Sequence, residues 1–174
     1  MPSGRTHDRI TFWCLPAIVG FSYLLTQKGE LTLIVASAFL FGGLMFGPDL
    51  DIYSVQFKRW GILRWLWLPY QKFLKHRSQL SHGLIIGTTL RIIYLLVCLL
   101  LAAIPGVALA QLIFGFDWNW QHFARDGVRR MIQDYPTEAI ALTIGLELGA
   151  MSHYLSDSIG SALKKQKTKG KSKK

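Results

Sequence analysis

The stretch HRSQLSHGLIIGTTLRIIYLLVCLLLAAIPGVALAQLIFGF, residues 76–116, determines how the rest of this chain is organised. It opens with two imidazoles, His76 and His82, separated by polar residues that include two serines. From Gly83 onward the stretch is apolar and carries Arg91 as its one charge. An apolar run of this length is typical of a membrane-spanning helix. The sequence therefore predicts that both histidines lie at the water edge of a membrane helix.

Three other apolar runs occupy residues 10–26, 31–47 and 137–159. The first two contain no charge, although 17 residues is near the lower limit for a spanning helix. Together with the long run, which we expect Pro105 to end, they predict an all-α integral membrane bundle of about four transmembrane helices. The first run is also compatible with a signal peptide, because basic residues precede it, but no small-residue cleavage site follows.

The charge distribution supports a membrane protein over a soluble one. Hydrophobic residues make up 51% of the 174-residue chain, yet the formal net charge is +10. The charges are concentrated between the apolar runs instead of alternating with them, as is typical of membrane proteins with charged flanks. The two cysteines, Cys14 and Cys98, fall inside apolar runs and indicate nothing about the redox compartment.

Two segments mix polar and basic residues in different ways. Residues 53–75 interleave tryptophan, tyrosine and phenylalanine with lysine and arginine, which favours an interfacial amphipathic segment that Pro69 divides into two short helices. Nucleic-acid binding also uses such a mixture, but the position between two membrane runs argues against it. Residues 164–174 contain seven lysines and no apolar residue, which predicts a disordered tail. We expect this tail to bind anionic lipid headgroups; a merely solvated tail is the alternative.

Four crossings would place both termini and residues 48–82 on one side of the membrane. Fifteen of the 20 lysines and arginines fall on that side and four on the other. The positive-inside rule makes the richer side cytoplasmic, in a bacterial inner membrane or a thylakoid-type internal membrane. Arg91, about two turns into its run, either extends back to the interface or faces a carboxylate in the bundle interior. His122 falls on the opposite side.

Three polar clusters share the cytoplasmic side. They are Pro48-Asp49-Leu50-Asp51, the His76–His82 stretch, and His153 with Asp157, and His7 precedes the first run. His153 and Asp157 are four residues apart, so on a helix they lie on one face, where both can bind one ion or the carboxylate can orient the imidazole. Each cluster alone is more typical of a solvated turn or a hydrogen-bonded pair.

In combination the clusters predict a metal site. Carboxylates and imidazoles at a membrane edge are costly unless they pair or bind a cation. Mixed His and Asp ligands favour a divalent transition metal, zinc first and manganese or iron next. We expect one of His76 and His82 to be a direct ligand and the other to be positioned through the loop. The predicted organisation is a membrane-embedded metal-binding domain over residues 1–160 and a lysine-rich tail over 161–174.

The order of these motifs resembles two related bacterial groups. A histidine near the N-terminus, PDLD, HRSQLSH and HYLSD are similar to the LexA-regulated membrane-bound metal-dependent hydrolases and, more closely, to small cyanobacterial-type integral membrane metal-binding proteins. The resemblance implies metal ligands at the following positions: His7, Asp49, Asp51, His76, His82, His153 and Asp157. It also implies hydrolase chemistry, of the phosphoester type when two metals are bridged. Arg77 is then a substrate-binding candidate, and a structural or sensing metal is the non-enzymatic alternative.

Overall fold

The computed structural model describes the backbone of residues 4–76 and 78–171, and their side chains except those of residue 5 and residues 157–171. No strand occurs in this part of the chain, so the predicted all-α class is confirmed. The elements are α1 (Gly4–Thr26), α2 (Gly29–Leu44), η1 (Pro48–Asp51), α3 (Val55–Arg59), η2 (Gly61–Leu66), α4 (Trp67–Phe73), α5 (Gln79–His82), α6 (Ile86–Phe114), α7 (Trp120–Gln133) and α8 (Pro136–Lys171).

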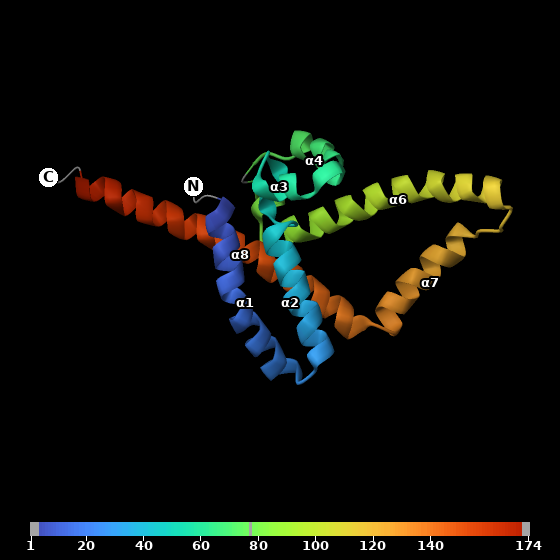
Figure 1. Cartoon of the computed structure of the whole chain (residues 1–174), viewed down its shortest axis with the longest axis horizontal. Helices are drawn as coiled ribbons and strands as arrows, with labels where there is room; N and C mark the ends of the chain where they lie inside the picture. Colours follow the sequence, from blue (N-terminus) through green and yellow to red (C-terminus); the bar gives the residue numbers. More distant parts are fainter. Residues whose placement is uncertain (1–3, 77, 172–174) are drawn as a thin grey trace.

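Helices α1, α2 and α8 form the packed part of the molecule (Figure 1). α1 and α2 make a hairpin whose turn contains Gln27 in the left-handed region, and α8 packs against both. The contact of α2 with α8 is the most extensive between any two described elements. Glycines make it close: a Cβ added at Gly149 would lie 2.4 Å from the carbonyl oxygen of Phe39, and one at Gly42 would lie 2.6 Å from that of Leu146. The two backbones therefore touch, as small residues permit in membrane helices.

Residues 48–82 form a cap over one end of this packed part, around Trp67, which has no exposed surface. The rings of Phe46, Trp60, Tyr70 and Tyr94 contact the Trp67 ring. The expected pair of short helices is present, but Pro69 does not separate them. It lies in the first turn of α4, where a backbone N–H is not needed, and the 3₁₀ helix η2 makes the break instead.

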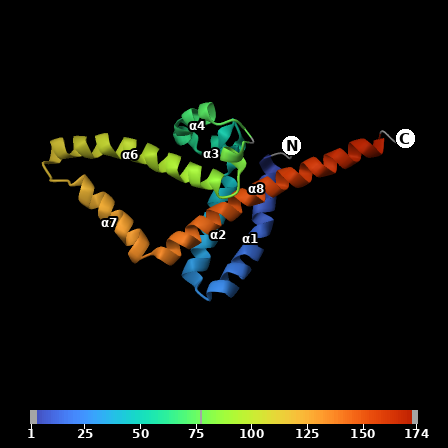
Figure 2. The same cartoon turned by 180° about the vertical axis from the view of Figure 1, so that it is seen from behind.

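α6 differs from the predicted third crossing at both ends. It begins at Ile86 and not at Gly83. The helix is interrupted after α5 because Gly83 is extended and Ile85 has a positive φ of 65°. It continues through Pro105 to Phe114, so the prediction that Pro105 ends the helix was wrong. A proline removes one helical hydrogen bond, which long apolar helices tolerate. Both views show α6 running away from the α1–α2–α8 group (Figures 1 and 2).

Three stretches of the described chain are long and apolar enough to cross a membrane: Thr6–Thr26, Gly29–Asp51 and Ile86–Phe114. The fourth predicted crossing, in α8, is not among these three stretches. The predicted bundle of four spans is therefore not confirmed.

Two further segments are helical. The 117–135 connection contains α7, a strongly amphipathic helix that Asn119 caps by accepting a hydrogen bond from the backbone N–H of His122 at 3.0 Å. The lysine-rich tail, predicted to be disordered, continues α8 as far as Lys171. Alanine, leucine and lysine are good helix formers, which accounts for the continuation beyond residue 160.

The contact between α2 and α8 gives the first prediction. Gly149→Ala should destabilise the protein by about 1–3 kcal/mol, because the new Cβ meets backbone atoms of α2 that cannot rotate away. The measurement is the thermal unfolding midpoint in detergent, followed by circular dichroism. Gly106→Ala in α6 is the matched control, since nothing lies within 4 Å of its added Cβ. Equal midpoints for the two variants would contradict the close contact.

Candidate metal centre

The turn that follows α2 presents two carboxylates. Pro48 starts the 3₁₀ helix η1, and Leu50 anchors it in the core with no exposed surface. The Gln71 side chain holds the turn from α4, donating to the carbonyl oxygen of Leu50 at 3.0 Å. Asp49 and Asp51, two residues apart on this short helix, consequently face different neighbours.

Asp51 faces His76, in the segment before α5. Its Oδ1 lies 2.8 Å from Nδ1 of His76, and the Asp51 side chain is fully buried. Nε2 of His76 is buried and has no hydrogen-bond partner. A metal-binding histidine commonly has its second ring nitrogen on a carboxylate, which fixes the tautomer and leaves the other nitrogen for the metal.

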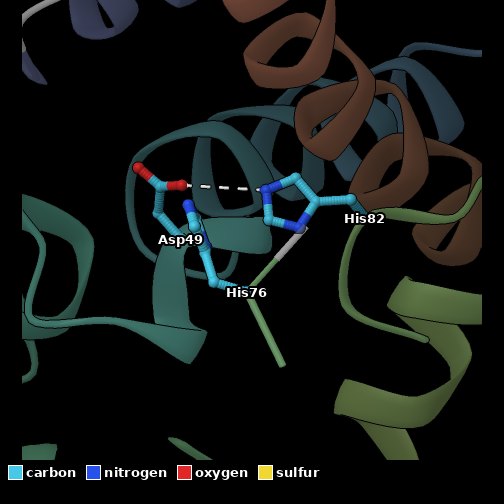
Figure 3. Close-up of side chains that lie close together, drawn as sticks. All are labelled: Asp49, His76 and His82. Carbon is cyan, nitrogen blue, oxygen red and sulfur yellow. Dashed lines mark ion pairs between the residues drawn. The ribbon is translucent and has the colours of Figure 1, made fainter. Parts of the chain in front are cut away.

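His82, at the end of α5, lies between the two carboxylates. Its Nε2 is 3.9 Å from Oδ1 of Asp49 (Figure 3). Its Nδ1 is 3.7 Å from Oδ2 of Asp51. The Ser81 hydroxyl lies 2.8 Å from Nδ1, while Nε2 has no hydrogen-bond partner. Burial lowers the pKa of the His82 imidazole below its ordinary value, while the Asp51 carboxylate acts in the opposite direction. The neutral ring keeps a lone pair for a metal ion at neutral pH.

Asp49, His76 and His82 form one potential ligand set. One ligand atom from each lies within 4.8 Å of the other two, and Figure 3 shows the three side chains converging from η1, from the segment before α5 and from α5. A carboxylate and two neutral imidazoles are a donor set that suits zinc, manganese or iron. The buried, unpartnered Nε2 atoms of both histidines fit this role. The residues present therefore fit a transition-metal ion.

His153 approaches the same carboxylate from α8. Its Nε2 lies 3.0 Å from Oδ2 of Asp49, although the two atoms are not aligned as a hydrogen bond. The ring is 3% exposed and stacks on the His7 ring of α1, with 3.8 Å between centroids. A cavity of about 20 Å³ is lined in part by His7, Asp49 and His153.

The structure thus brings together most of the residues that the sequence singled out. Asp51 lies against both imidazoles of the HRSQLSH stretch, and His76 and His82 both belong to the ligand set, where the sequence favoured only one as a direct ligand. Arg77 and the side chain of Asp157 lie outside the described residues. His122 lies on α7. The main contact of α7 is with α8 and not with η1 or α5, which carry the ligand set.

Sequence reasoning did not anticipate the support that Arg91 gives to this site. Arg91 is 1% exposed and donates to the carbonyl oxygen of Ser81 and to the hydroxyl of Thr88, both at 2.9 Å. It is therefore buried, as the second predicted orientation requires, but its hydrogen-bond partners are a carbonyl and a hydroxyl and not the expected carboxylate. It holds the α5 turn that carries His82. The carboxylate of Glu147, also in this region, accepts from the backbone N–H of Ile85 at 2.9 Å. An arginine two turns inside an apolar run was the available signal.

Comparisons with known proteins agree with a metal site. An uncharacterized protein of Aquifex aeolicus (strain VF5) is 36% identical over 58 residues, a match that covers 33% of this chain and 40% of that protein. No solved structure matches the chain significantly. The profile of a family described as "Uncharacterized metal-binding protein (DUF2227)" matches residues 2–167. Because that match covers nearly the whole sequence, the chain belongs to this family of metal-binding proteins.

Proposed function

We propose that this protein is an integral membrane, metal-dependent hydrolase of the phosphoester type, with its site at the cytoplasmic face of the membrane. The observation that carries the proposal is the convergence of Asp49, His76 and His82, whose imidazole Nε2 atoms are buried without hydrogen-bond partners. Zinc is the metal that we propose first, then manganese or iron. When bound, such an ion lowers the pKa of a coordinated water and polarises a phosphoryl oxygen.

The protein's own residues would prepare the site for this chemistry. The Asp51 carboxylate fixes the His76 ring, and the Ser81 hydroxyl fixes the His82 ring, so that each presents Nε2. Arg77, which follows His76 directly in the sequence, is the residue that we propose for binding a substrate phosphate. A guanidinium suits that role because it presents several donors to phosphate oxygens.

A structural or sensing metal is the second candidate function. The observation that favours it is that Asp49 lies near the start of the cap and His76 and His82 lie near its end, so an ion there would tie the two ends of the cap together. A structural zinc site is usually closed by four protein ligands, whereas a catalytic one keeps a position for water. Removal of a structural metal should lower the unfolding midpoint strongly. Removal of a catalytic one should abolish hydrolysis with a smaller change in stability.

For the membrane arrangement we propose four crossings, with both termini cytoplasmic. Three helical stretches suit a span by length and composition, and α6, at 29 residues, is long enough to cross while strongly tilted. The apolar half of α8 would supply the fourth crossing, with α7 lying along the opposite membrane surface. On the cytoplasmic side the seven lysines of residues 164–174 would then meet anionic headgroups.

Reporter fusions test this arrangement. A fusion after residue 171 should report the cytoplasm, and one inserted near Gly127 in α7 should report the opposite compartment. The physical reason is the charge asymmetry between the two sets of connections. Reporters on the same side would contradict the four crossings.

Metal content tests the proposal most directly. Detergent-purified protein should contain at least about one transition-metal ion per chain by elemental analysis. Asp49→Ala and His82→Ala should each reduce that content, because each removes a member of the ligand set. His122→Ala should leave it unchanged, since His122 is an exposed residue of α7. Metal-free protein of full stability would rule out this site.

Hydrolysis gives a separate measurement. Protein loaded with zinc or manganese should cleave a phosphoester within a panel of membrane lipids, and chelation should abolish the cleavage. Asp51→Asn should reduce metal affinity and cleavage by about 10–100-fold, the usual effect of losing the group that orients a metal-binding histidine. Cleavage that persists after chelation and in the Asp51→Asn variant would refute the enzymatic proposal while leaving the metal site in place.

A further inference from the structure

We infer that the centre binds two ions and that Asp49 bridges them. This inference rests on the proposed metal function and deepens it. The first ion belongs to the set of Asp49, His76 and His82, and the second to Asp49 together with His153. The two oxygens of Asp49 support this division, because Oδ1 lies nearest His82 and Oδ2 lies nearest His153.

Distance separates the two positions. With bonds of about 2.1 Å to nitrogen and oxygen, two ligands of one ion lie at most about 4.2 Å apart. Asp49, His76 and His82 have ligand atoms within 4.8 Å of one another, so a small closing movement suffices for one ion. His153, although fully described, is not a member of that set. At least one ligand atom of that set therefore lies more than 4.8 Å from the ring nitrogens of His153, beyond the span of two ligands of one ion.

Two candidate ligand atoms at the second position have the spacing of adjacent metal ligands. Adjacent ligands of one metal ion lie about 3.0–3.5 Å apart, given bonds of about 2.1 Å. Nε2 of His153 and Oδ2 of Asp49 are 3.0 Å apart, without the alignment of a hydrogen bond. Both ring nitrogens of His153 are buried without a hydrogen-bond partner, in a side chain that is 97% buried. The Asp49 carboxylate compensates Nε2, so the unpartnered Nδ1 is the atom whose burial is costly.

A small cavity adjoins Asp49 and His153. Its volume is about 20 Å³, and His7, Asp49 and His153 are among its lining residues. A cavity of about 10–15 Å³ holds one water molecule, so this one accommodates a single ion or water and no larger ligand. His7 stacks on His153 at the same place and holds the ring against rotation.

A bridging carboxylate between two ions would set the substrate class. Two-metal sites hold their ions about 3.5–4 Å apart and stabilise both the attacking and the leaving oxygen of a displacement at phosphorus. One bridging aspartate with imidazoles on either side is compatible with that spacing. The inference therefore favours a phosphate ester as substrate.

The test uses the full chain in detergent, titrated with Mn²⁺ alone. Wild-type protein should bind about two ions per chain and give the electron paramagnetic resonance spectrum of a magnetically coupled pair. His153→Ala and His82→Ala should each bind about one ion and give the spectrum of isolated Mn²⁺. Asp49→Ala should lose more metal than either, because it belongs to both positions. His122→Ala is the matched control and should retain the coupled pair.

Three results would overturn the inference. They are one ion per wild-type chain at saturation, an isolated Mn²⁺ spectrum in the wild type, and an unchanged stoichiometry in His153→Ala. Each leaves the single-ion function standing, whereas wild-type protein without metal would refute both. The wild-type spectrum requires no variant, so misfolding cannot obscure it. Circular dichroism of each variant confirms that a lost ion reflects a lost ligand.

Discussion

The backbone contact between α2 and α8 is the constraint on which the rest of the structure depends. It forms because Gly42, Gly145 and Gly149 leave no Cβ between the helices. The contact fixes the position of α8 along the axis of α2. It thereby places His153 3.0 Å from Asp49, although the two residues are more than one hundred positions apart in the sequence. A methyl group at this crossing would separate the helices and carry the imidazole away from the carboxylate.

The polar side chains at that end of the molecule are buried, where a nitrogen or oxygen atom without a hydrogen-bond partner costs free energy. Imidazole nitrogens of His76, His82 and His153 are buried without hydrogen-bond partners, beside helices apolar enough to span a membrane. The cap holds two of these rings by hydrogen bonds to their other nitrogens, and Arg91 holds the α5 turn from the apolar side. These contacts orient the imidazole rings in the absence of an ion, as the residues around a metal site commonly do.

The helical class and the identity of the polar clusters could be predicted from the sequence. A long apolar run predicts a helix from local sequence alone. The reason is that a helix in apolar surroundings satisfies its backbone hydrogen bonds within its own segment. PDLD, HRSQLSH and His153 were found in the same way, since a costly residue at the end of an apolar run stands out from its neighbours. The predictions that Pro105 ends a helix and that the lysine-rich tail is disordered were wrong, because the local composition was compatible with more than one backbone conformation.

Which histidine each aspartate contacts could be seen only in the tertiary structure. Asp49 and Asp51 are the same residue type two positions apart, yet Asp49 lies between His153 and His82 while Asp51 pairs with His76. That difference arises because Leu50 and Gln71 fix the rotation of η1 against the cap. The interior orientation of Arg91 likewise depends on the carbonyl of Ser81, which lies ten residues earlier in the chain. These side-chain orientations depend on contacts between segments that are distant in the sequence, so no local sequence pattern predicts them.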